Sequence, residues 1–320
     1  MKGKPMVNIK EKIGRLGFFD EKFYCQSYPE ACKGGISPLD HYLEIGWKEG
    51  KNPSLSFNSS WYLNSYPDVA KSGINPLVHY IEFGIFEGRL PAPSFCWNKR
   101  LDYPGSVKAL FSSHSREKAA ELAVGSAGQF QSMGNILLEL TVLWGGLSEG
   151  MKLLDVGCGS GRLAYALFCS GLSDKVQYVG IDIVPELLDY AREKCKKANF
   201  IFLYNDRLKM PLENEQFDVV SFFSVLTHLL QEEAVIMLKE AKRVLKAQGK
   251  LLFTYLNIFS QNHKEMFLQR VEQMEKNASP LLLDIYISPE LALEYARMLE
   301  MEVLYNGPSS CGQYLCVLKK

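Results

Sequence analysis

The chain has 320 residues, 47% of them hydrophobic and 22% charged, which suits a folded protein of one large domain or two smaller ones. Lysine plus arginine and aspartate plus glutamate each number 36, so the formal net charge is zero and no global field favours nucleic acid as a partner. No apolar signal segment opens the sequence, and no apolar run reaches the roughly 20 residues of a membrane span. We therefore expect a cytoplasmic protein without an integral membrane segment.

Eight cysteines are scattered along the chain without a Cys-X-X-Cys pair. Because no secretory signal accompanies them, the pattern predicts free thiols in a reducing compartment. Neither paired cysteines nor His-X-X-X-His spacing is present, so we expect no metal site.

Two copies of a 38-residue repeat occupy residues 18–95, after an N-terminal tail of residues 1–17. Tyr28 in the first copy recurs as Tyr66 in the second, and His41 recurs as His79, with the same displacement of 38 positions (66 − 28 and 79 − 41). Each copy is predicted to form two short helices, the second beginning at a proline, which suits a first helical turn. The sequence therefore predicts a small all-α domain of two repeats.

The repeated histidines and aromatic residues each allow two interpretations. His41 and His79 could bind a metal, but no second ligand lies one helical turn from either, which favours a structural role. The repeated aromatic side chains could stack on a sugar or form a core, and their regular spacing favours the core.

After a connector expected at residues 96–117, strands and helices alternate across residues 118–320. Buried strands are predicted at 153–156, 177–181, 200–204, 217–223 and 250–256. The chain is predicted to become helical from Lys118, and helices are predicted at 136–144, 162–170, 185–197 and 232–245. Alternation of this kind specifies a parallel sheet with helices on both faces.

A glycine-rich loop follows the first of these strands and opens a helix. Gly157, Gly159 and Gly161 carry no Cβ that would obstruct a ligand lying against the backbone, and the start of the helix offers free N–H donors. A dinucleotide-binding loop of an oxidoreductase would have its third glycine at the position of Arg162. The spacing therefore disfavours a nicotinamide cofactor.

Two acidic residues after the next strands narrow the choice of cofactor. Asp182 ends the second strand, where a carboxylate can accept both hydroxyls of a ribose, and this feature fits either cofactor. Asp206 follows the third strand and, together with the acid Asp155 before the glycine loop, argues against the oxidoreductase alternative.

This ordered set of motifs, over about residues 150–255, resembles the class I S-adenosylmethionine-dependent methyltransferases. The resemblance implies a Rossmann-like α/β fold, in which a seven-stranded methyltransferase sheet with helices on both faces follows the small all-α domain. Residues 301–304 and 313–318 would supply the final antiparallel pair of strands.

The resemblance also implies S-adenosyl-L-methionine as cofactor and assigns its contacts by position. The glycine loop and the strand before it would line the methionine moiety through Asp155, Gly157, Cys158 and Gly159. The ribose hydroxyls would contact Asp182, the adenine edge Asp206 and the backbone of Arg207, and the sulfonium Phe223 and Ser224. Gly161 and Ile183 are further expected cofactor contacts. Phe130 lies in a segment that closes over the cofactor in relatives, or it is simply a core residue.

The repeats resemble the Tyr-Pro-Asp-Val, His-Tyr and Glu-Gly-Arg repeats found beside glycosyltransferases and methyltransferases of bacterial surface-polysaccharide pathways. This implies O-methylation of a sugar hydroxyl in a surface glycan or its precursor, with a glycosyltransferase as a possible partner of the repeats. Transfer to a small molecule or an amine is the alternative, as is a non-catalytic docking scaffold. The intact glycine loop and Asp182 argue against the scaffold.

A hydroxyl acceptor requires a base, and His228 is the candidate. It follows the fourth strand at the carboxyl edge of the sheet, and its intrinsic pKa suits a base near neutrality. Alternatively, His228 caps the following helix or only shapes the pocket. His114, Tyr255 and His263 are further pocket candidates on position alone.

Overall fold

Two separate units make up the chain. The computed structural model describes residues 9–33, 35–93, 103–276 and 284–320. Residues Met1–Phe95 and Asn205–Asn214 form the first unit, and Cys96–Tyr204 and Glu215–Lys320 form the second. Part of the connector expected at residues 96–117 lies outside the described residues.

The first unit is helical, as expected, but each repeat contains more helical segments than the two predicted. The first copy has α2 (Glu21–Ser27), η1 (Pro29–Cys32), α3 (Pro38–His41) and η2 (Tyr42–Gly46). The second has α4 (Ser59–Ser65), α5 (Pro67–Ser72), α6 (Pro76–His79) and η3 (Tyr80–Gly84). The proline of each Tyr-Pro pair, Pro29 or Pro67, begins a further helical turn, because its fixed φ suits the first helical position.

The two copies make the same contacts 38 positions apart. The hydroxyl of Tyr24 lies 3.0 Å from Nδ1 of His41, and the hydroxyl of Tyr62 lies 3.1 Å from Nδ1 of His79. Tyr24 and Tyr62 are both fully buried. Each histidine therefore has a tyrosine partner in the core of its own copy, as a structural role requires.

A helix precedes the repeats within the segment expected to be an N-terminal tail. Helix α1 (Ile9–Leu16) buries Ile13 and Leu16. This helix was not predicted, because a helix of eight residues with only two buried side chains gives a weak periodic pattern.

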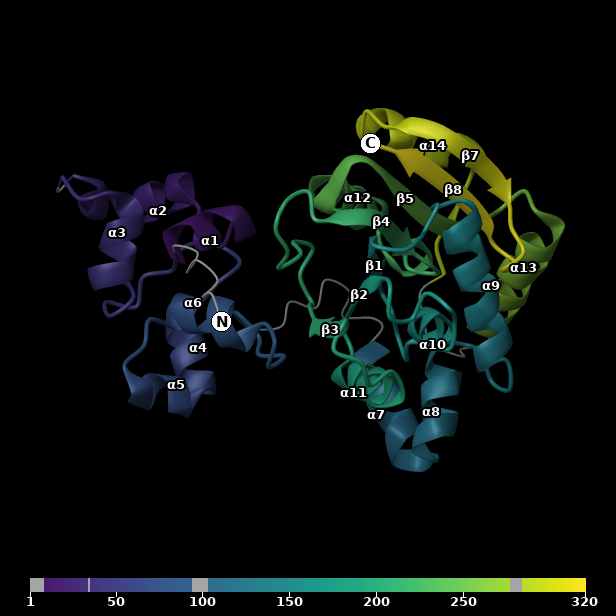
Figure 1. Ribbon diagram of the computed structural model, residues 1–320, viewed down its shortest axis with the longest axis horizontal. Helices are drawn as coiled ribbons and strands as arrows, with labels where there is room; N and C mark the ends of the chain where they lie inside the picture. The colour runs from purple at the N-terminus through teal and green to yellow at the C-terminus, as the bar shows by residue number, and fades with distance from the viewer. Residues whose placement is uncertain (1–8, 34, 94–102, 277–283) are drawn as a thin grey trace. The chain divides into compact units, whose positions relative to one another are not determined.

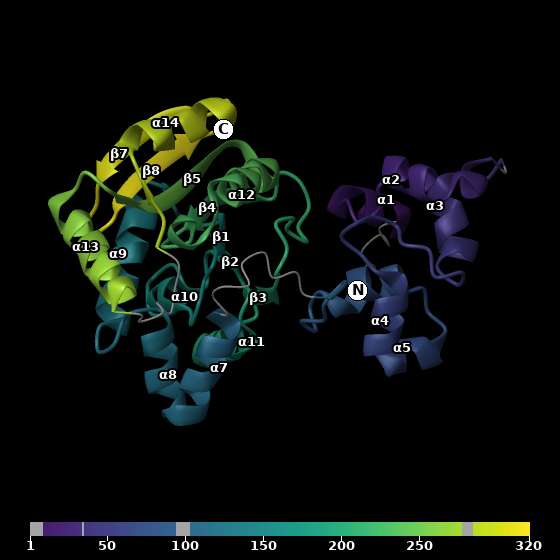
Figure 2. The same ribbon diagram turned by 180° about the vertical axis from the view of Figure 1, so that it is seen from behind.

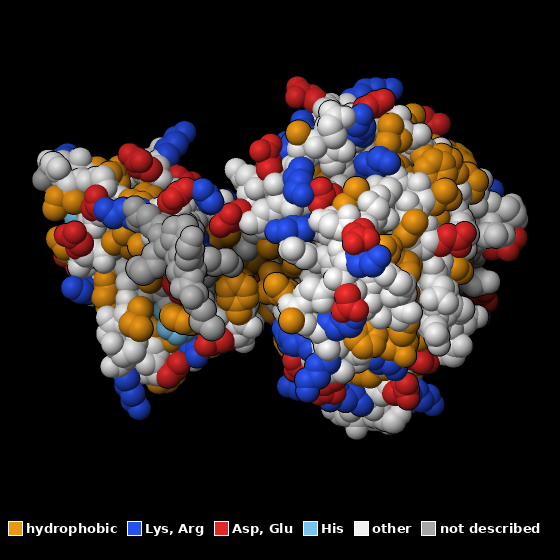
Figure 3. Space-filling view, viewed as in Figure 1, with side chains coloured by type: hydrophobic (Ala, Val, Ile, Leu, Met, Phe, Trp, Pro, Cys, Tyr) orange, Lys and Arg blue, Asp and Glu red, His pale blue; other side chains and the backbone are white. Residues whose placement is uncertain are grey.

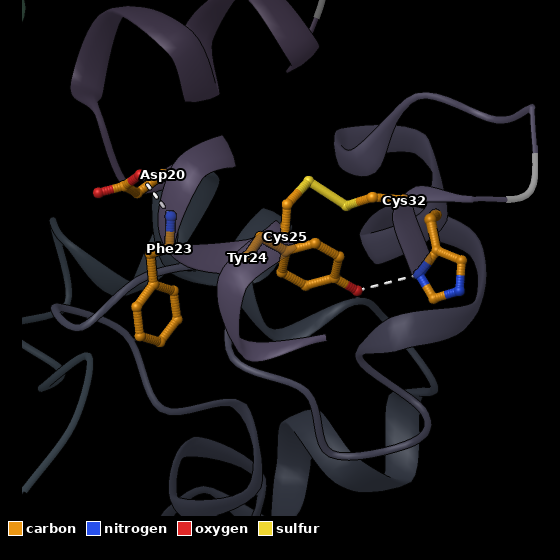
Figure 4. The surroundings of a disulfide bond; sticks show 6 residues. Asp20, Phe23, Tyr24, Cys25 and Cys32 are labelled. Carbon is orange, nitrogen blue, oxygen red and sulfur yellow. Dashed lines mark hydrogen bonds between the residues drawn. A yellow bond between two sulfur atoms is a disulfide. The ribbon is translucent and has the colours of Figure 1, made fainter. Parts of the chain in front are cut away.

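A disulfide in the first repeat contradicts the prediction of free thiols for two cysteines. Cys25 in α2 and Cys32 in η1 are bonded, with their Cα atoms 5.7 Å apart (Figure 4). The turn at Pro29 brings α2 and η1 together, a proximity that spacing in the sequence does not reveal. The other cysteines that the structure describes are free thiols: Cys158, Cys169, Cys195, Cys311 and Cys316.

The second unit is built on a mixed sheet with strand order β3-β2-β1-β4-β5-β8-β7 (Figure 1). The parallel strands are β1 (Lys152–Val156), β2 (Gln177–Asp182), β3 (Phe200–Tyr204), β4 (Phe217–Phe222) and β5 (Leu245–Asn257). The antiparallel pair is β7 (Glu302–Pro308) and β8 (Tyr314–Lys319), and the short β6 (Tyr286–Ile287) adds to β5. The predicted sheet and its final antiparallel pair are confirmed, with β6 as an addition.

Helices cover both faces of this sheet, as Figures 1 and 2 show from opposite sides. On one face lie α9 (Phe130–Leu143), α10 (Arg162–Phe168) and α11 (Pro185–Lys194), which share a core cluster with the strands. On the other face lie α12 (Gln231–Val244) and α14 (Pro289–Met298). The strands that carry this core are almost continuously buried, as expected for a parallel sheet covered on both faces.

Two further helices lie outside the segments for which helices were predicted. These are α7 (Tyr103–Ser113), inside the expected connector, and α13 (Gln261–Glu275) after β5. Helix α8 (Arg116–Ala123) begins two residues before Lys118, from which helical structure was predicted. Among the described residues, no helix combines the length and apolar character needed to cross a membrane.

Candidate cofactor site

The turn after β1 has a backbone that only glycine suits. Gly157, Gly159 and Gly161 all have positive φ angles, of 69°, 54° and 82°. A Cβ added to Gly157 would lie 2.4 Å from Cγ2 of Val225, and one added to Gly159 would lie 2.7 Å from Cγ1 of Val124. The loop therefore keeps its shape only with bare backbone at these positions, because the side chains of Val225 and Val124 pack directly against it.

Backbone hydrogen bonds tie this loop to the end of β2. The amides of Gly157 and Cys158 donate to the carbonyl oxygen of Ile181 at 2.8 and 3.0 Å. The amide of Gly159 donates to Oδ2 of Asp182 at 2.8 Å. Two residues predicted to bind the cofactor, one in the loop and one on β2, are thus joined directly.

The Asp182 carboxylate is buried and accepts from the backbone on both oxygens. Oδ1 accepts the amide of Val184 at 2.9 Å, while Oδ2 accepts Gly159. Burial raises the pKa of Asp182 to about 6, against the effect of its backbone donors. Because each carboxylate oxygen has two lone pairs, capacity remains to accept a hydroxyl at either one.

Asp155 is held by side chains from the two neighbouring strands. The hydroxyl of Tyr178 donates to its Oδ2 at 2.8 Å, and that of Ser221 donates to its Oδ1 at 3.0 Å. Burial raises its pKa to about 6, and these two donors oppose that rise. Tyr178 and Ser221 were not predicted as site residues. The strand pairing that places Ser221 opposite Asp155 could have been found by aligning the predicted strands.

Cys158 and Ile183 differ in exposure. The Cys158 side chain is buried, and burial raises the pKa of its thiol well above the usual range, so it is a neutral packing group. A Cβ at Gly180 in β2 would lie 2.8 Å from its sulfur, so β2 needs a glycine there. Ile183, in contrast, is 42% exposed beside Asp182 and is open to a ligand.

The chain after β4 is strained at Ser224. Its φ of 61° lies in the left-handed region, which costs a residue with a side chain about 1–2 kcal/mol. The hydroxyl of Thr254 in β5 accepts its amide at 2.8 Å and fixes this conformation. Phe223 beside it is buried in the core of the sheet. Strain at the carboxyl end of a central strand is a common property of binding sites.

His228 lies in the short helix η4 (Leu226–His228) and is half-buried. A small hollow adjoins η4 and is lined by Leu226, Leu229, Gln231, Ala234, Tyr255, Ile285, Ile287 and Tyr295. In its wall, the hydroxyl of Tyr255 donates to Asn306 at 2.7 Å. Of the further pocket candidates, Tyr255 thus does line a hollow beside η4.

The other two pocket candidates have structural surroundings. His263 is buried, accepts the amide of Asn257 at Nδ1 and lies 2.8 Å from the Gly312 carbonyl oxygen at Nε2. Both ring nitrogens are therefore used in holding the end of β5 against the β7–β8 turn. His114 is exposed after α7, with Nδ1 3.0 Å from the hydroxyl of Ser113. Neither lines the hollow beside η4.

Phe130 packs in the protein core. Its ring is buried at the start of α9, 6.0 Å from the ring of Tyr165 and 6.4 Å from that of Tyr190. The Lys194 ammonium lies 5.4 Å from its centroid. These contacts favour the core interpretation of Phe130; its role towards the cofactor stays a prediction.

Asp206 and Arg207 lie in the first unit. Oδ1 of Asp206 is 3.3 Å from Nε of Arg207, and both side chains are largely buried. In the chain they follow Tyr204, the last residue of β3, by only two or three positions.

No group of three or more histidine, cysteine or acidic side chains with the arrangement of a metal site occurs within the described ranges. The candidate site is built from the glycine loop and the two buried carboxylates of Asp155 and Asp182. An open sheet with such a loop after β1 and an acid ending β2 is the architecture of a Rossmann-like nucleoside-binding domain.

Comparison with known proteins identifies the family. Residues 147–300 match the methyltransferase domain family. A demethylmenaquinone methyltransferase of Lactococcus lactis is 31% identical over 199 residues, covering 60% of this chain and 74% of that protein. The 27-O-demethylrifamycin SV methyltransferase of Amycolatopsis mediterranei is 31% identical over 146 residues, covering 44% of this chain.

The chain spans about half the length of most curated relatives that it matches. The matched region covers 52% of the rifamycin enzyme and 42–47% of four further relatives. Among solved structures, an O-methyltransferase family 2 protein of Planctomyces limnophilus has a TM-score of 0.50 at 18% identity, over 67% of this chain and 65% of that one. The chain belongs to the family of S-adenosylmethionine-dependent methyltransferases, and S-adenosylmethionine is its cofactor.

Proposed function

We propose that the protein transfers a methyl group from S-adenosylmethionine to a hydroxyl oxygen, with a sugar of a bacterial surface glycan or its precursor as the acceptor. The observation that carries the cofactor part is the direct hydrogen bond between Gly159 of the loop and the Asp182 carboxylate. This bond joins a bare backbone surface to a carboxylate suited to a ribose.

The residues of the site fit the parts of this cofactor. The backbone of the glycine loop is proposed to contact the methionine moiety, and Asp182 retains lone pairs for two ribose hydroxyls. Ser224 and Phe223, at the end of β4, are proposed to lie beside the sulfonium. When bound, the cofactor supplies a methyl carbon that the sulfonium already activates for in-line displacement.

His228 is proposed to act as the base. In the reaction the acceptor oxygen forms a bond to the methyl carbon, the carbon–sulfur bond breaks, and its electron pair neutralises the sulfur. The hydroxyl proton passes to a nitrogen of His228, since an imidazole can act as a general base. The half-buried position of His228 in η4, shortly after the carboxyl end of β4, supports this role.

The hydroxyl acceptor is supported by relatives whose names denote O-methylation, among them ubiquinone biosynthesis O-methyltransferases at 30–32% identity. The glycan acceptor, and a glycosyltransferase as partner of the repeats, rest on the resemblance of the repeats to those of polysaccharide pathways. A second candidate acceptor, a small hydroxyl compound, is favoured by the names of relatives, which denote methylation of a rifamycin and of a ubiquinone precursor.

Transfer of a labelled methyl group to two panels of acceptors tests which class of acceptor the protein uses. Glycans and their precursors form one panel, and small phenolic or quinol compounds the other. We expect transfer to glycans in the wild type and its loss in Asp182→Ala. Label only in the small-compound panel would replace the glycan with the second candidate.

A further inference from the structure

Arg162, the first residue of α10, has no acceptor for its guanidinium among the described residues. Every other arginine that the structure describes has a carboxylate of an aspartate or glutamate as its partner. Arg162 is nevertheless half-buried, directly after the last glycine of the loop. A guanidinium that has lost part of its hydration without gaining an acceptor is destabilised, and a bound anion can offset that loss.

The backbone at Arg162 is held between two helices. A Cβ added to Gly161 would lie 2.9 Å from Cβ of Ala191 in α11. One added to Gly134 in α9 would lie 2.5 Å from the carbonyl oxygen of Arg162. These close contacts fix the backbone from which the Arg162 side chain extends.

The Asp155 carboxylate attracts this guanidinium without pairing with it. Burial lowers the pKa of Arg162, and the negative charge of Asp155 opposes that effect. Both oxygens of Asp155 already accept hydroxyls, Oδ1 from Ser221 and Oδ2 from Tyr178. Asp155 therefore favours a positive charge near the glycine loop, while the donors of the guanidinium stay available.

A second donor in the same turn also lacks an acceptor. Ser160 is buried, and within the part of the chain that the structure describes its hydroxyl has no hydrogen-bond partner. Ser160 and Arg162 together give the turn between β1 and α10 more donors than acceptors. An anionic group is the ligand chemistry that such an excess of donors favours.

We propose that Arg162 binds the carboxylate of the methionine moiety of S-adenosylmethionine. The proposal rests on the placement of that moiety along the glycine loop in the proposed function. A guanidinium suits a carboxylate, because its planar fork of donors can form two parallel hydrogen bonds to the two oxygens. The carboxylate takes no part in methyl transfer, so this contact strengthens binding of the cofactor and of its product alike and leaves the transfer step unchanged.

Two ligands that differ only in this carboxylate test the proposal: S-adenosylhomocysteine and its decarboxylated analogue. In Arg162→Met the Kd for S-adenosylhomocysteine should rise about 10- to 100-fold, the scale of hydrogen bonds to a charged group. The Kd for the analogue should stay within about twofold of its wild-type value, because independent changes are additive to roughly that extent. Calorimetric titration of the full-length protein measures both.

Two further variants complete the comparison. Arg297→Met is the matched control, since Arg297 lies in the same unit but pairs with Glu294 on the exposed side of α14. It should leave both Kd values near wild type. Arg162→Lys keeps the charge and loses the fork, so its Kd for S-adenosylhomocysteine should lie between those of the wild type and Arg162→Met. In Arg162→Met the KM for S-adenosylmethionine should rise with its Kd, and kcat should change little.

The failure of this proposal is distinguishable from that of the proposed function. An equal loss of affinity for both ligands would show that Arg162 acts through the conformation of the turn, which overturns the proposal. An unchanged Kd for S-adenosylhomocysteine in folded Arg162→Met, with binding lost in Asp182→Ala, also overturns it and leaves the proposed function standing. If Arg162→Met does not fold, Arg162→Lys carries the same comparison of the two ligands. No binding of S-adenosylhomocysteine by the wild type would overturn both.

Discussion

At the scale of single residues, the site depends on two buried carboxyls that are hard to ionise. Asp155 and Asp182 both have a pKa raised to about 6 by burial, and each oxygen accepts a hydrogen bond. Asp155 uses Tyr178 and Ser221, so it mainly fixes the strands around the loop. Asp182 accepts backbone amides, and its spare lone pairs can serve a ligand.

The pKa of Asp182 predicts how cofactor binding depends on pH. The ionised carboxylate accepts ribose hydroxyls, and at pH 5 only about a tenth of a group with a pKa near 6 is ionised. The affinity for S-adenosylhomocysteine should therefore fall about tenfold from pH 7 to pH 5. Calorimetric titration at several pH values measures this. Asp182→Asn should give weaker binding and a flatter profile, and a wild-type affinity that is equal at pH 5 and pH 7 contradicts the role.

His228 can be tested apart from cofactor binding. As a base it contributes to the transfer step alone, so His228→Ala should lower kcat by roughly 10²- to 10⁴-fold and leave the Kd for S-adenosylhomocysteine unchanged. The comparison uses labelled-methyl turnover on the identified acceptor over a range of pH. Near-normal turnover with the wild-type pH profile would show that His228 only shapes the pocket.

At the scale of elements, the conformation of the turn between β1 and α10 is fixed by the side chains that pack against its glycines. Gly157→Ala would put a methyl group 2.4 Å from Val225 in a left-handed conformation. We expect a loss of at least about 2 kcal/mol in the free energy of unfolding, from backbone strain plus overpacking. Urea denaturation of Gly157→Ala and Gly171→Ala measures it. Gly171 is the control because a Cβ added there would meet no atom within 4 Å. Equal stability of the two variants would contradict this packing.

The disulfide gives the first repeat a stabilisation that the second lacks. The positions in the second copy that correspond to Cys25 and Cys32 are Leu63 and Ala70. A bridge across seven positions should stabilise the first copy by about 2 kcal/mol through restriction of the unfolded chain. A reductant should therefore speed amide exchange in α2 and η1 but not in α4 and α5. Equal effects on both copies would show that the bridge does not form.

Strands and site residues could be predicted from the sequence to different extents. The strand β3 has the bounds 200–204 that its apolar run predicts, because parallel strands buried on both faces are continuously apolar. Helix α13 gave no such signal, since His263 is its only buried residue. The Cys25–Cys32 pairing and the anchoring of Lys209 on Gly17 also escaped prediction, because they depend on turns and on contacts between segments distant in sequence.

At the scale of the whole molecule, the formal net charge is zero. On the face of the second unit drawn in Figure 3, acidic and basic side chains are mixed, without a wide field of one sign. This face thus gives no electrostatic reason to expect a polyanionic partner.

Calorimetric titration of the full-length protein with S-adenosylhomocysteine, with NADH as a control, tests the central claim most directly. We predict a Kd on the order of micromolar for the nucleoside, no binding of NADH, and a loss of affinity in Asp182→Ala of about 10- to 100-fold, the scale of hydrogen bonds to a charged group. A folded protein that binds NADH, or that binds S-adenosylhomocysteine equally well without the Asp182 carboxylate, would contradict the claim.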